Sequence, residues 1–222
     1  MILKFTILVP LFNFRSLSKS MDSPIFSLVH LDLSDNHLHV IHSYVLSGFP
    51  NLRSLNLSGN GLHTVSGSAF SLPALETLDL SRNQLPTVGV HLFETSPKLT
   101  EVNLASNAIS RLNDGTFGHL TSLSLLDLSG NSLMRIEDNV FVGMNISHLD
   151  LGHNNLRKMP SLPLRKLTAA RTLILDGNPL HFLGKKSLSC KTSSVQIGST
   201  TSGHVGQNSS ARSSLYDPAL FF

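Results

Sequence analysis

The fold is decided by an eleven-residue unit, which reads LSLLDLSGNSL at residues 123–133. Leucine occupies its first, fourth, sixth and eleventh positions and asparagine its ninth. The same pattern, with an occasional Ile, Val or Ala in place of Leu, begins at six other residues. These copies are LVHLDLSDNHL from Leu28, LRSLNLSGNGL from Leu52, LETLDLSRNQL from Leu75, LTEVNLASNAI from Leu99, ISHLDLGHNNL from Ile146 and ARTLILDGNPL from Ala170. The chain is therefore a seven-fold repeat.

The repeat keeps a constant period of 23 or 24 residues, measured between the ninth-position asparagines. Apolar fourth and sixth positions alternate with polar ones, which predicts one short strand per repeat. Such strands are stable only when stacked, as a parallel sheet over one continuous core. The asparagine amide suits the inward turn after each strand, where backbone groups need partners. We therefore expect a structural hydrogen-bonded ladder of Asn36, Asn60, Asn83, Asn107, Asn131, Asn154 and Asn178.

A second apolar position closes each repeat on its far side, and it is occupied by Leu46, Phe70, Phe93, Phe117, Phe141 and Leu164. With this position, residues 28–183 resemble the leucine-rich repeat superfamily. The period and the phenylalanines are similar to its "typical" extracellular subclass, which includes small leucine-rich proteoglycans, tsukushi, and Toll- and Slit-like ectodomains. The resemblance implies an α/β solenoid, a right-handed horseshoe of seven repeats with a parallel β-sheet on its concave side.

Both flanking segments depart from the family pattern. Extracellular members usually carry disulfide-bonded caps, whereas this chain contains only Cys190 and so has no disulfide caps. We therefore expect a fragment or splice form of a longer protein. Residues 1–27 begin with the apolar run MILKFTILVPLFNF, which fits a signal peptide, a degraded cap or repeat with Asn13 placed 23 residues before Asn36, or unrelated translated sequence. Residues 184–222 are rich in Ser, Thr and Gly, which predicts a disordered tail.

The sequence contains no motif of an enzyme, cofactor site or metal site. A single cysteine excludes a multi-thiolate metal centre. His39 and His63 share the twelfth position of adjacent repeats and should stack, but no third metal ligand accompanies them. No apolar run reaches the roughly 18 residues that a membrane span needs. We therefore expect neither catalysis nor a membrane span in this chain.

Charge is distributed unevenly along the chain. The net charge is +3 and the pI about 9.2, which by themselves suggest a polyanionic partner. Residues 28–156 carry a net −6, however, and residues 157–191 a net +7. The outward repeat positions hold eight acids against three bases, which predicts an acidic concave face and disfavours nucleic acid there. A sulfated glycan could bind the basic C-terminal end, formed by Arg157, Lys158, Arg165, Lys166, Arg171, Lys185, Lys186 and Lys191.

The variable outward positions form the predicted partner-binding surface. Acids of the fifth position, including Asp32, should form a solvated row about 10 Å apart on alternate strands. The predicted binding residues are Arg53, Glu76, Thr77, Asp79, Arg82, Thr100, Glu101, Leu125, Asp127, His148, Asp150 and Arg171.

Three Asn-x-Ser triplets are candidate glycosylation sites. Asn145 lies in a loop before a strand and is the best acceptor, while Asn56 lies within a strand and Asn208 in the tail. The family resemblance implies an extracellular protein partner, in adhesion, matrix assembly or regulation of a growth factor or receptor. The alternative is a cytosolic scaffold or regulatory subunit, which the lack of disulfides would suit.

Overall fold

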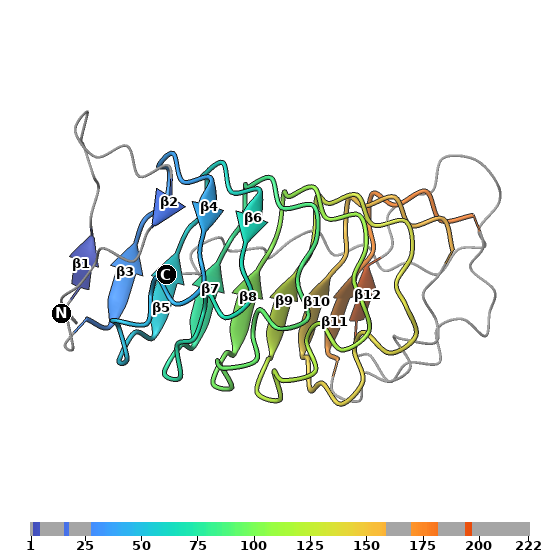
Figure 1. The fold of residues 1–222 in the computed structure, drawn as a ribbon. Coiled ribbons are helices and arrows are strands. Elements are labelled where there is room, and N and C mark those ends of the chain that lie inside the picture. Colours follow the sequence, from blue (N-terminus) through green and yellow to red (C-terminus); the bar gives the residue numbers. More distant parts are fainter. Residues whose placement is uncertain (1, 5–15, 18–27, 159–169, 182–193, 197–222) are drawn as a thin grey trace.

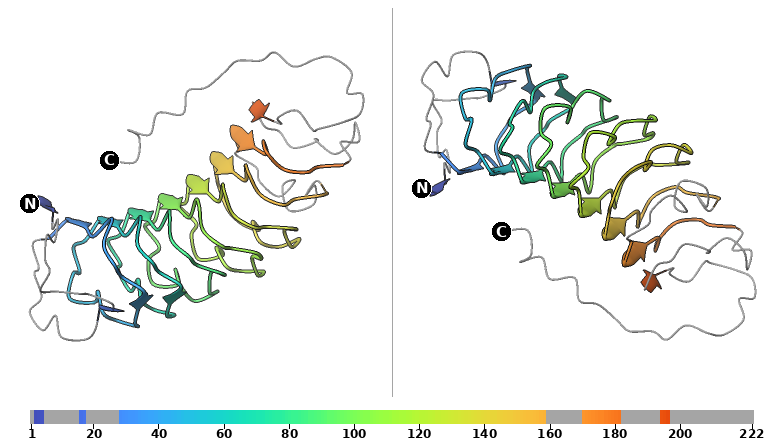
Figure 2. Two further views of the ribbon diagram at one scale, coloured as in Figure 1. Left: turned by 90° about the horizontal axis from the view of Figure 1, so that it is seen from above. Right: turned by 90° about the horizontal axis from the view of Figure 1, so that it is seen from below.

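The structure is a computed structural model that describes residues 2–4, 16–17, 28–158, 170–181 and 194–196. Its main element is a nine-stranded parallel sheet, in the order β1-β3-β5-β7-β8-β9-β10-β11-β12. The strands follow an arc and line its inner side, with the turns on the outer side (Figures 1 and 2). The predicted horseshoe is thus confirmed. The strands are β1 (Ile2–Lys4), β3 (His30–Asp32), β5 (Ser54–Asn56), β7 (Thr77–Asp79), β8 (Glu101–Asn103), β9 (Leu125–Asp127), β10 (His148–Asp150), β11 (Thr172–Ile174) and β12 (Ser194–Gln196).

The register of the sheet follows the repeat. Leu31 pairs with Leu55, and Leu55 with Leu78, so equivalent positions stack from coil to coil. A second sheet contains β2 (Ser16–Leu17), β4 (Val40–Ile41) and β6 (Thr64–Val65), and the bridge between Thr87 and Arg111 repeats the same kind of pairing further along the stack. Each coil therefore touches its neighbours along two separate lines of backbone pairing.

The core is made by the predicted apolar positions. In all seven repeats the first, fourth, sixth and eleventh residues are buried, and none is more than 7% exposed. On the far side the phenylalanines form a spine, in which the rings of Phe93 and Phe117 stack with centroids 5.9 Å apart. Burying one such ring stabilises the fold by roughly 1.5–3 kcal/mol. The repeated apolar positions therefore all lie in the core.

The convex segments that the structure describes are turns and contain no helix. Between β4 and β5 the backbone forms hydrogen bonds over three residues, such as Ser47 N to Tyr44 O at 3.1 Å and Phe49 N to Leu46 O at 3.1 Å. Gly48 and Pro50 disfavour continuation of a helix there. The expectation of an α/β solenoid is therefore corrected in this detail: the outer layer of the described coils consists of turns.

The asparagine side chains form a ladder between coils. Asn131 accepts a hydrogen bond from Ile109 N at 3.0 Å and donates through Nδ2 to Leu104 O at 2.9 Å and Leu128 O at 3.0 Å. The five other asparagines from Asn60 to Asn178 make the equivalent bonds. Each amide therefore joins the turn of its own coil to the preceding coil.

Strands also occur in the two flanking segments. β1 pairs with β3 and β2 with β4, as an additional N-terminal coil would. Asn13 lies outside the described residues, and cleavage of a signal peptide stays a prediction. β12 pairs with β11, aligning Val195 with Leu173, which corrects the prediction of disorder for these three residues of the tail. Val195 and Ile197 alternate like the fourth and sixth positions of a repeat. The rest of residues 184–222 lies outside the described part.

We predict that Asn131→Ala lowers the free energy of unfolding by about 3 kcal/mol or more, because it leaves Ile109 N and two carbonyls without partners inside the stack. Urea denaturation followed by circular dichroism measures the change. Asn155→Ala is the matched control, since the Asn155 side chain is exposed. Equal stability losses in the two variants would contradict the structural role of the ladder.

Candidate protein-binding face

The inner face of the sheet is formed by side chains of the second, third, fifth and eighth repeat positions. Within each strand the middle residue points into the core, so its two neighbours point to the concave side. The third position is exposed or half-buried in every repeat. These third-position residues are His30, Ser54, Thr77, Glu101, Leu125, His148 and Thr172.

The eighth position brings its side chains to the rim of this face through an unusual backbone conformation. Its φ angle is positive in every repeat, including the four that lack glycine: Asp35 at 52°, Arg82 at 54°, Ser106 at 56° and His153 at 51°. This left-handed conformation is unfavourable for residues with a Cβ atom. The next coil stabilises it, because the eighth-position N–H donates to the seventh-position carbonyl of that coil, as from Arg82 N to Ala105 O at 2.9 Å.

Fifth-position side chains hold the turn that follows each strand. In six repeats a side-chain oxygen accepts a hydrogen bond from the seventh-position N–H, for example Asp127 Oδ1 from Ser129 N at 2.8 Å and Asn103 Oδ1 from Ala105 N at 3.0 Å. Asp127 is only 3% exposed. Asp79 accepts a further bond from Asn103 Nδ2 at 3.3 Å. The predicted row of solvated acids is thus corrected: these side chains are buried or half-buried, and each accepts a hydrogen bond from the backbone of the following turn.

Two ion pairs cross the concave side. Arg53 Nη1 lies 3.2 Å from Glu76 Oε1 in the next repeat, and Arg82 Nη2 lies 3.1 Å from Asp35 Oδ1 two repeats away. The second pair passes over Gly59, where a Cβ atom would lie 2.0 Å from the Asp35 carboxylate. Exposed pairs of this kind stabilise a fold by at most about 1 kcal/mol. Their main effect is that both arginines already have an acidic partner.

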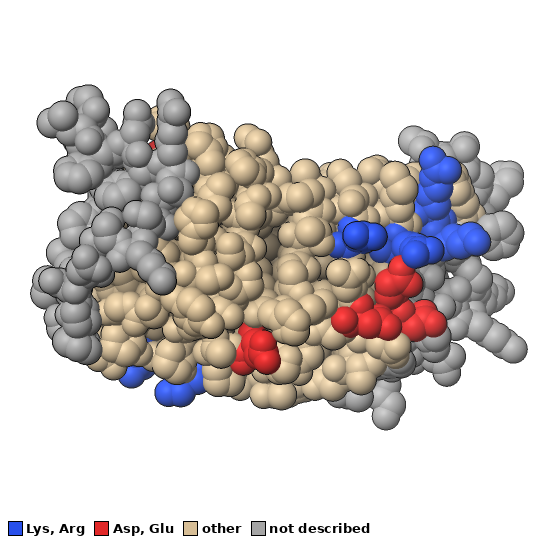
Figure 3. Space-filling model, in the orientation of Figure 1, with Lys and Arg blue, Asp and Glu red and all other residues tan. Residues whose placement is uncertain are grey.

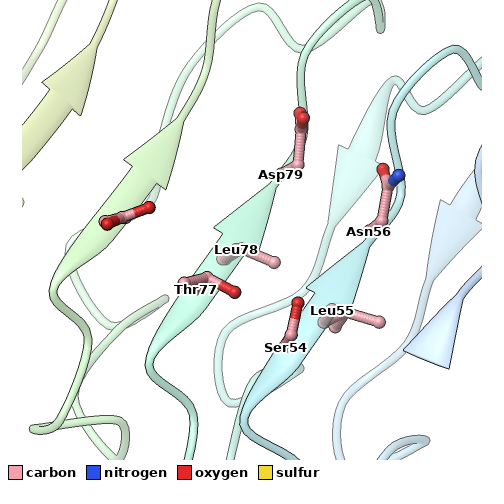
Figure 4. Close-up of a pocket in the computed structure, with 7 residues that line it drawn as sticks. Ser54, Leu55, Asn56, Thr77, Leu78 and Asp79 are labelled. Carbon is pink, nitrogen blue, oxygen red and sulfur yellow. The ribbon is translucent and has the colours of Figure 1, made fainter. Parts of the chain in front are cut away.

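A small depression lies between the two pairs and spans β5, β7 and β8 (Figure 4). Ser54, Thr77 and Glu101 line it from the third position of three adjacent repeats, and Asp79 lies toward the strand ends. Burial raises the pKa of Glu101 above its ordinary value. No described residue donates a hydrogen bond to its carboxylate. The full lining is Ser54, Leu55, Asn56, Thr77, Leu78, Asp79 and Glu101.

The C-terminal half of the face contains a second group of acids. The pKa of Asp150 is raised to about 6: burial is the largest cause and the neighbouring Asp127 and Asp176 act in the same direction, while the Gly152 N–H and His153 lower it. Asp150 therefore changes charge near the pH of mildly acidic compartments.

The remaining predicted binding residues differ in their contacts and in their exposure. Thr100 donates its hydroxyl to Glu76 O at 3.0 Å, and Ser124 and Ser147 continue the same chain of bonds along the second position, so Thr100 contributes to the stack. His148 and Arg171 are exposed, and Leu125 is half-buried. The sequence analysis did not predict this chain of hydroxyl hydrogen bonds, although Thr and Ser occupy the second position of three successive repeats.

The glycosylation triplets differ in accessibility. Asn145 is exposed in the loop before β10. Asn56 is only 6% exposed, and its Oδ1 accepts a hydrogen bond from Ser58 N at 3.0 Å. Asn208 lies outside the described residues. In the folded protein the structure thus favours Asn145 over Asn56 as an acceptor.

We predict that Asp150→Asn stabilises the protein above pH 6 by about 1–3 kcal/mol and has little effect near pH 4. The raised pKa means that the folded state holds a proton more tightly than the unfolded state, so wild-type stability falls as pH rises from about 4 to about 6. Asparagine accepts the seventh-position bond equally well in two other repeats. Urea denaturation at pH 4 and pH 7.5 measures both effects, and a gain of equal size at the two pH values would contradict the assignment.

Comparisons with known proteins agree with this geometry. The family model described as "Leucine rich repeat" matches residues 26–85, 50–107 and 97–156. Tsukushi of Gallus gallus is 38% identical over 165 residues, covering 70% of this chain and 43% of that protein. The transforming growth factor beta activator LRRC33 of Danio rerio is 32% identical over 209 residues, covering 82% of this chain and 30% of that protein. Keratocan of Gallus gallus is 35% identical over 79 residues, or 34% of this chain and 21% of that protein.

Among solved structures, TLR13 in its complex with ssRNA13 superposes with a TM-score of 0.71 at 29% identity, covering 77% of this chain and 24% of that one. This chain spans less than half the length of each of these relatives. In the part that the structure describes, no helix is long and apolar enough to cross a bilayer. The repeats, the horseshoe and the matching family model together show that the chain belongs to the leucine-rich repeat family.

Proposed function

We propose that this protein binds a basic extracellular protein on its concave face and thereby acts in adhesion, matrix assembly or signalling. The observation that carries the proposal is the depression at Ser54, Thr77 and Glu101, where a carboxylate without a hydrogen-bond donor among the described residues lies beside two hydroxyl groups on the sheet. A lysine or arginine side chain would fit these groups, since it donates hydrogen bonds and carries the opposite charge.

The surrounding charges favour the same class of partner. Arg53 and Arg82 are engaged by Glu76 and Asp35, so they offer little attraction to an acidic ligand. Glu101 and Asp79 remain as the acids of the depression, and Asp150 and Asp176 continue the acidic character toward the C-terminal repeats. Electrostatic complementarity of this kind mainly selects the partner and speeds encounter.

The relatives support an extracellular setting. Tsukushi and Keratocan are secreted proteins, and LRRC33, whose name describes a transforming growth factor beta activator, is a surface protein. TLR13 was solved with single-stranded RNA. An acidic concave face would disfavour RNA in this protein, because phosphates would be repelled. A signalling or matrix protein is therefore the partner class we propose.

Glycosylation separates this proposal from a cytosolic scaffold. When the full chain is expressed in animal cells, we expect a fraction that carries a glycan on Asn145, visible as a mobility shift removed by a peptide N-glycosidase. Asn145→Gln together with Asn208→Gln should abolish the shift even though the Asn56 triplet remains, because Asn56 is buried. Protein without any glycan, recovered only from the cytosol, would contradict the extracellular setting.

The concave site is tested by selecting peptides from a random displayed library on the immobilised protein. We expect enrichment of peptides with a lysine or arginine on wild-type protein and loss of that enrichment, by about tenfold, on Glu101→Gln, because a charge-assisted bond of about 1.5–3 kcal/mol is removed. Asp176→Asn is the control, since it makes the same charge change on an exposed residue outside the depression. Equal loss in both variants would show that only net charge matters and would contradict the proposed site.

A further inference from the structure

A line of basic residues runs along one flank of the solenoid, away from the concave face. The thirteenth repeat position follows the turn after each strand, and in three successive repeats it is Arg111, Arg135 and Lys158. All three are exposed, whereas the fourteenth-position residues Leu112 and Ile136 are buried. This alternation is that of a strand, so the thirteenth-position side chains point outward. We call Arg111, Arg135, Lys158 and the adjacent exposed Arg157 the basic ridge.

The spacing of the basic ridge is fixed by the backbone. Thr87 pairs with Arg111 in a parallel bridge, and Ser132 N donates to Ile109 O and Asn155 N to Leu133 O, each at 2.9 Å. Coils joined in this way are about 4.8 Å apart, so the three thirteenth-position cations lie on successive coils over about 10 Å. The basic ridge needs no conformational change to present its charges together.

Among the described residues, only one of the four cations of the basic ridge, Arg135, has an acidic partner. Space-filling Figure 3 shows the basic side chains gathered on this face, with acidic side chains beside them over the same coils. Arg135 Nη2 lies 2.8 Å from Glu137 Oε1. Asp114 accepts hydrogen bonds from Asn139 N at 3.1 Å and Asn139 Nδ2 at 2.9 Å. Arg111, Arg157 and Lys158 form no ion pair with any described residue.

We propose that the basic ridge binds a sulfated polysaccharide chain that runs along the stack of coils. Arginine and lysine form charge-assisted hydrogen bonds with the oxygens of such anions. The ligand must be narrow, because Asp114, Glu137 and Asp138 follow Arg111 and Arg135 within three residues and would repel a wide anionic surface such as a bilayer. Single-stranded RNA is also narrow, but it relies on aromatic side chains for base stacking, and the ridge contains none.

This proposal changes the location expected for a glycan. The sequence pointed to the C-terminal end as one basic patch, but among its described residues Arg171 precedes β11 while Arg157 and Lys158 follow β10. The two ends of parallel strands lie at opposite edges of a sheet. Arg157 and Lys158 therefore join Arg111 and Arg135 instead of Arg171, and the site extends along the flank into earlier repeats.

Heparin serves as the probe, with the full 222-residue chain in solution. We expect that changing Arg111, Arg135 and Lys158 together to Gln lowers the slope of log affinity against log salt by about 2 to 3, as expected from losing three anion contacts. The matched control changes Arg53, Arg82 and Arg171 to Gln, an equal loss of charge outside the ridge. Circular dichroism checks the fold, and Lys158→Gln alone gives the same comparison if the triple variant is unstable.

The outcomes separate the ligand classes. Retention of heparin by the ridge variant at wild-type strength, or an equal loss in the control, would overturn the proposal. Equal affinity for hyaluronan, which lacks sulfate, for single-stranded RNA or for vesicles with anionic lipid would also overturn it, in favour of a general polyanion site. Selection of basic peptides by the concave face is measured separately, so failure at one surface leaves the result at the other intact.

Discussion

The whole structure depends on one constraint, which is that the backbone must turn inward after every strand without leaving polar groups unpaired. Buried N–H and C=O groups without partners would each cost about 1–3 kcal/mol. The asparagine ladder removes this cost: Asn131, for example, serves Ile109 N on one coil and carbonyls on two coils with a single side chain. The same amide that closes a turn also fixes the distance to the next coil. Stability in such a stack therefore comes from neighbouring pairs of coils.

The asparagine ladder and the buried apolar positions stabilise the coils from within. The outward positions can therefore vary and are available to bind partners. Each surface of the molecule corresponds to a set of repeat positions. The second, third, fifth and eighth positions supply the concave face, and the twelfth and thirteenth positions supply the flank. A residue's place within its repeat thus determines which partner it can meet. His39 and His63 illustrate this, since their shared twelfth position stacks the two rings with centroids 6.2 Å apart, as predicted.

The sequence predicted the core, the register and the ladder from Asn60 to Asn178 correctly, because these follow from side chains that recur with the period; the described bonds of Asn36 stay within its own coil. It was less informative about the fifth position. Asp127 looks like a solvated acid in the sequence, yet it is buried against the N–H of Ser129, a contact that only the turn geometry creates. The positive φ of Arg82 and its pairing with Asp35 two repeats away depend equally on that geometry. β12 was missed because Thr200 stands where the pattern expects asparagine, although Val195 and Ile197 keep the apolar alternation.

The distribution of charge follows from the same architecture. A net charge of +3 hides how the charges are placed: the outward positions of the inner face hold eight acids and three bases, and bases occupy the thirteenth position of three successive coils. In a globular fold such charges would be scattered by tertiary packing. In a solenoid, identical positions of successive coils stack about 4.8 Å apart, so a few substitutions at one position produce a continuous charged line. The concave face and the basic ridge use different positions of each coil, so the two partners that we propose, a basic protein and an anionic polysaccharide, would not compete for residues.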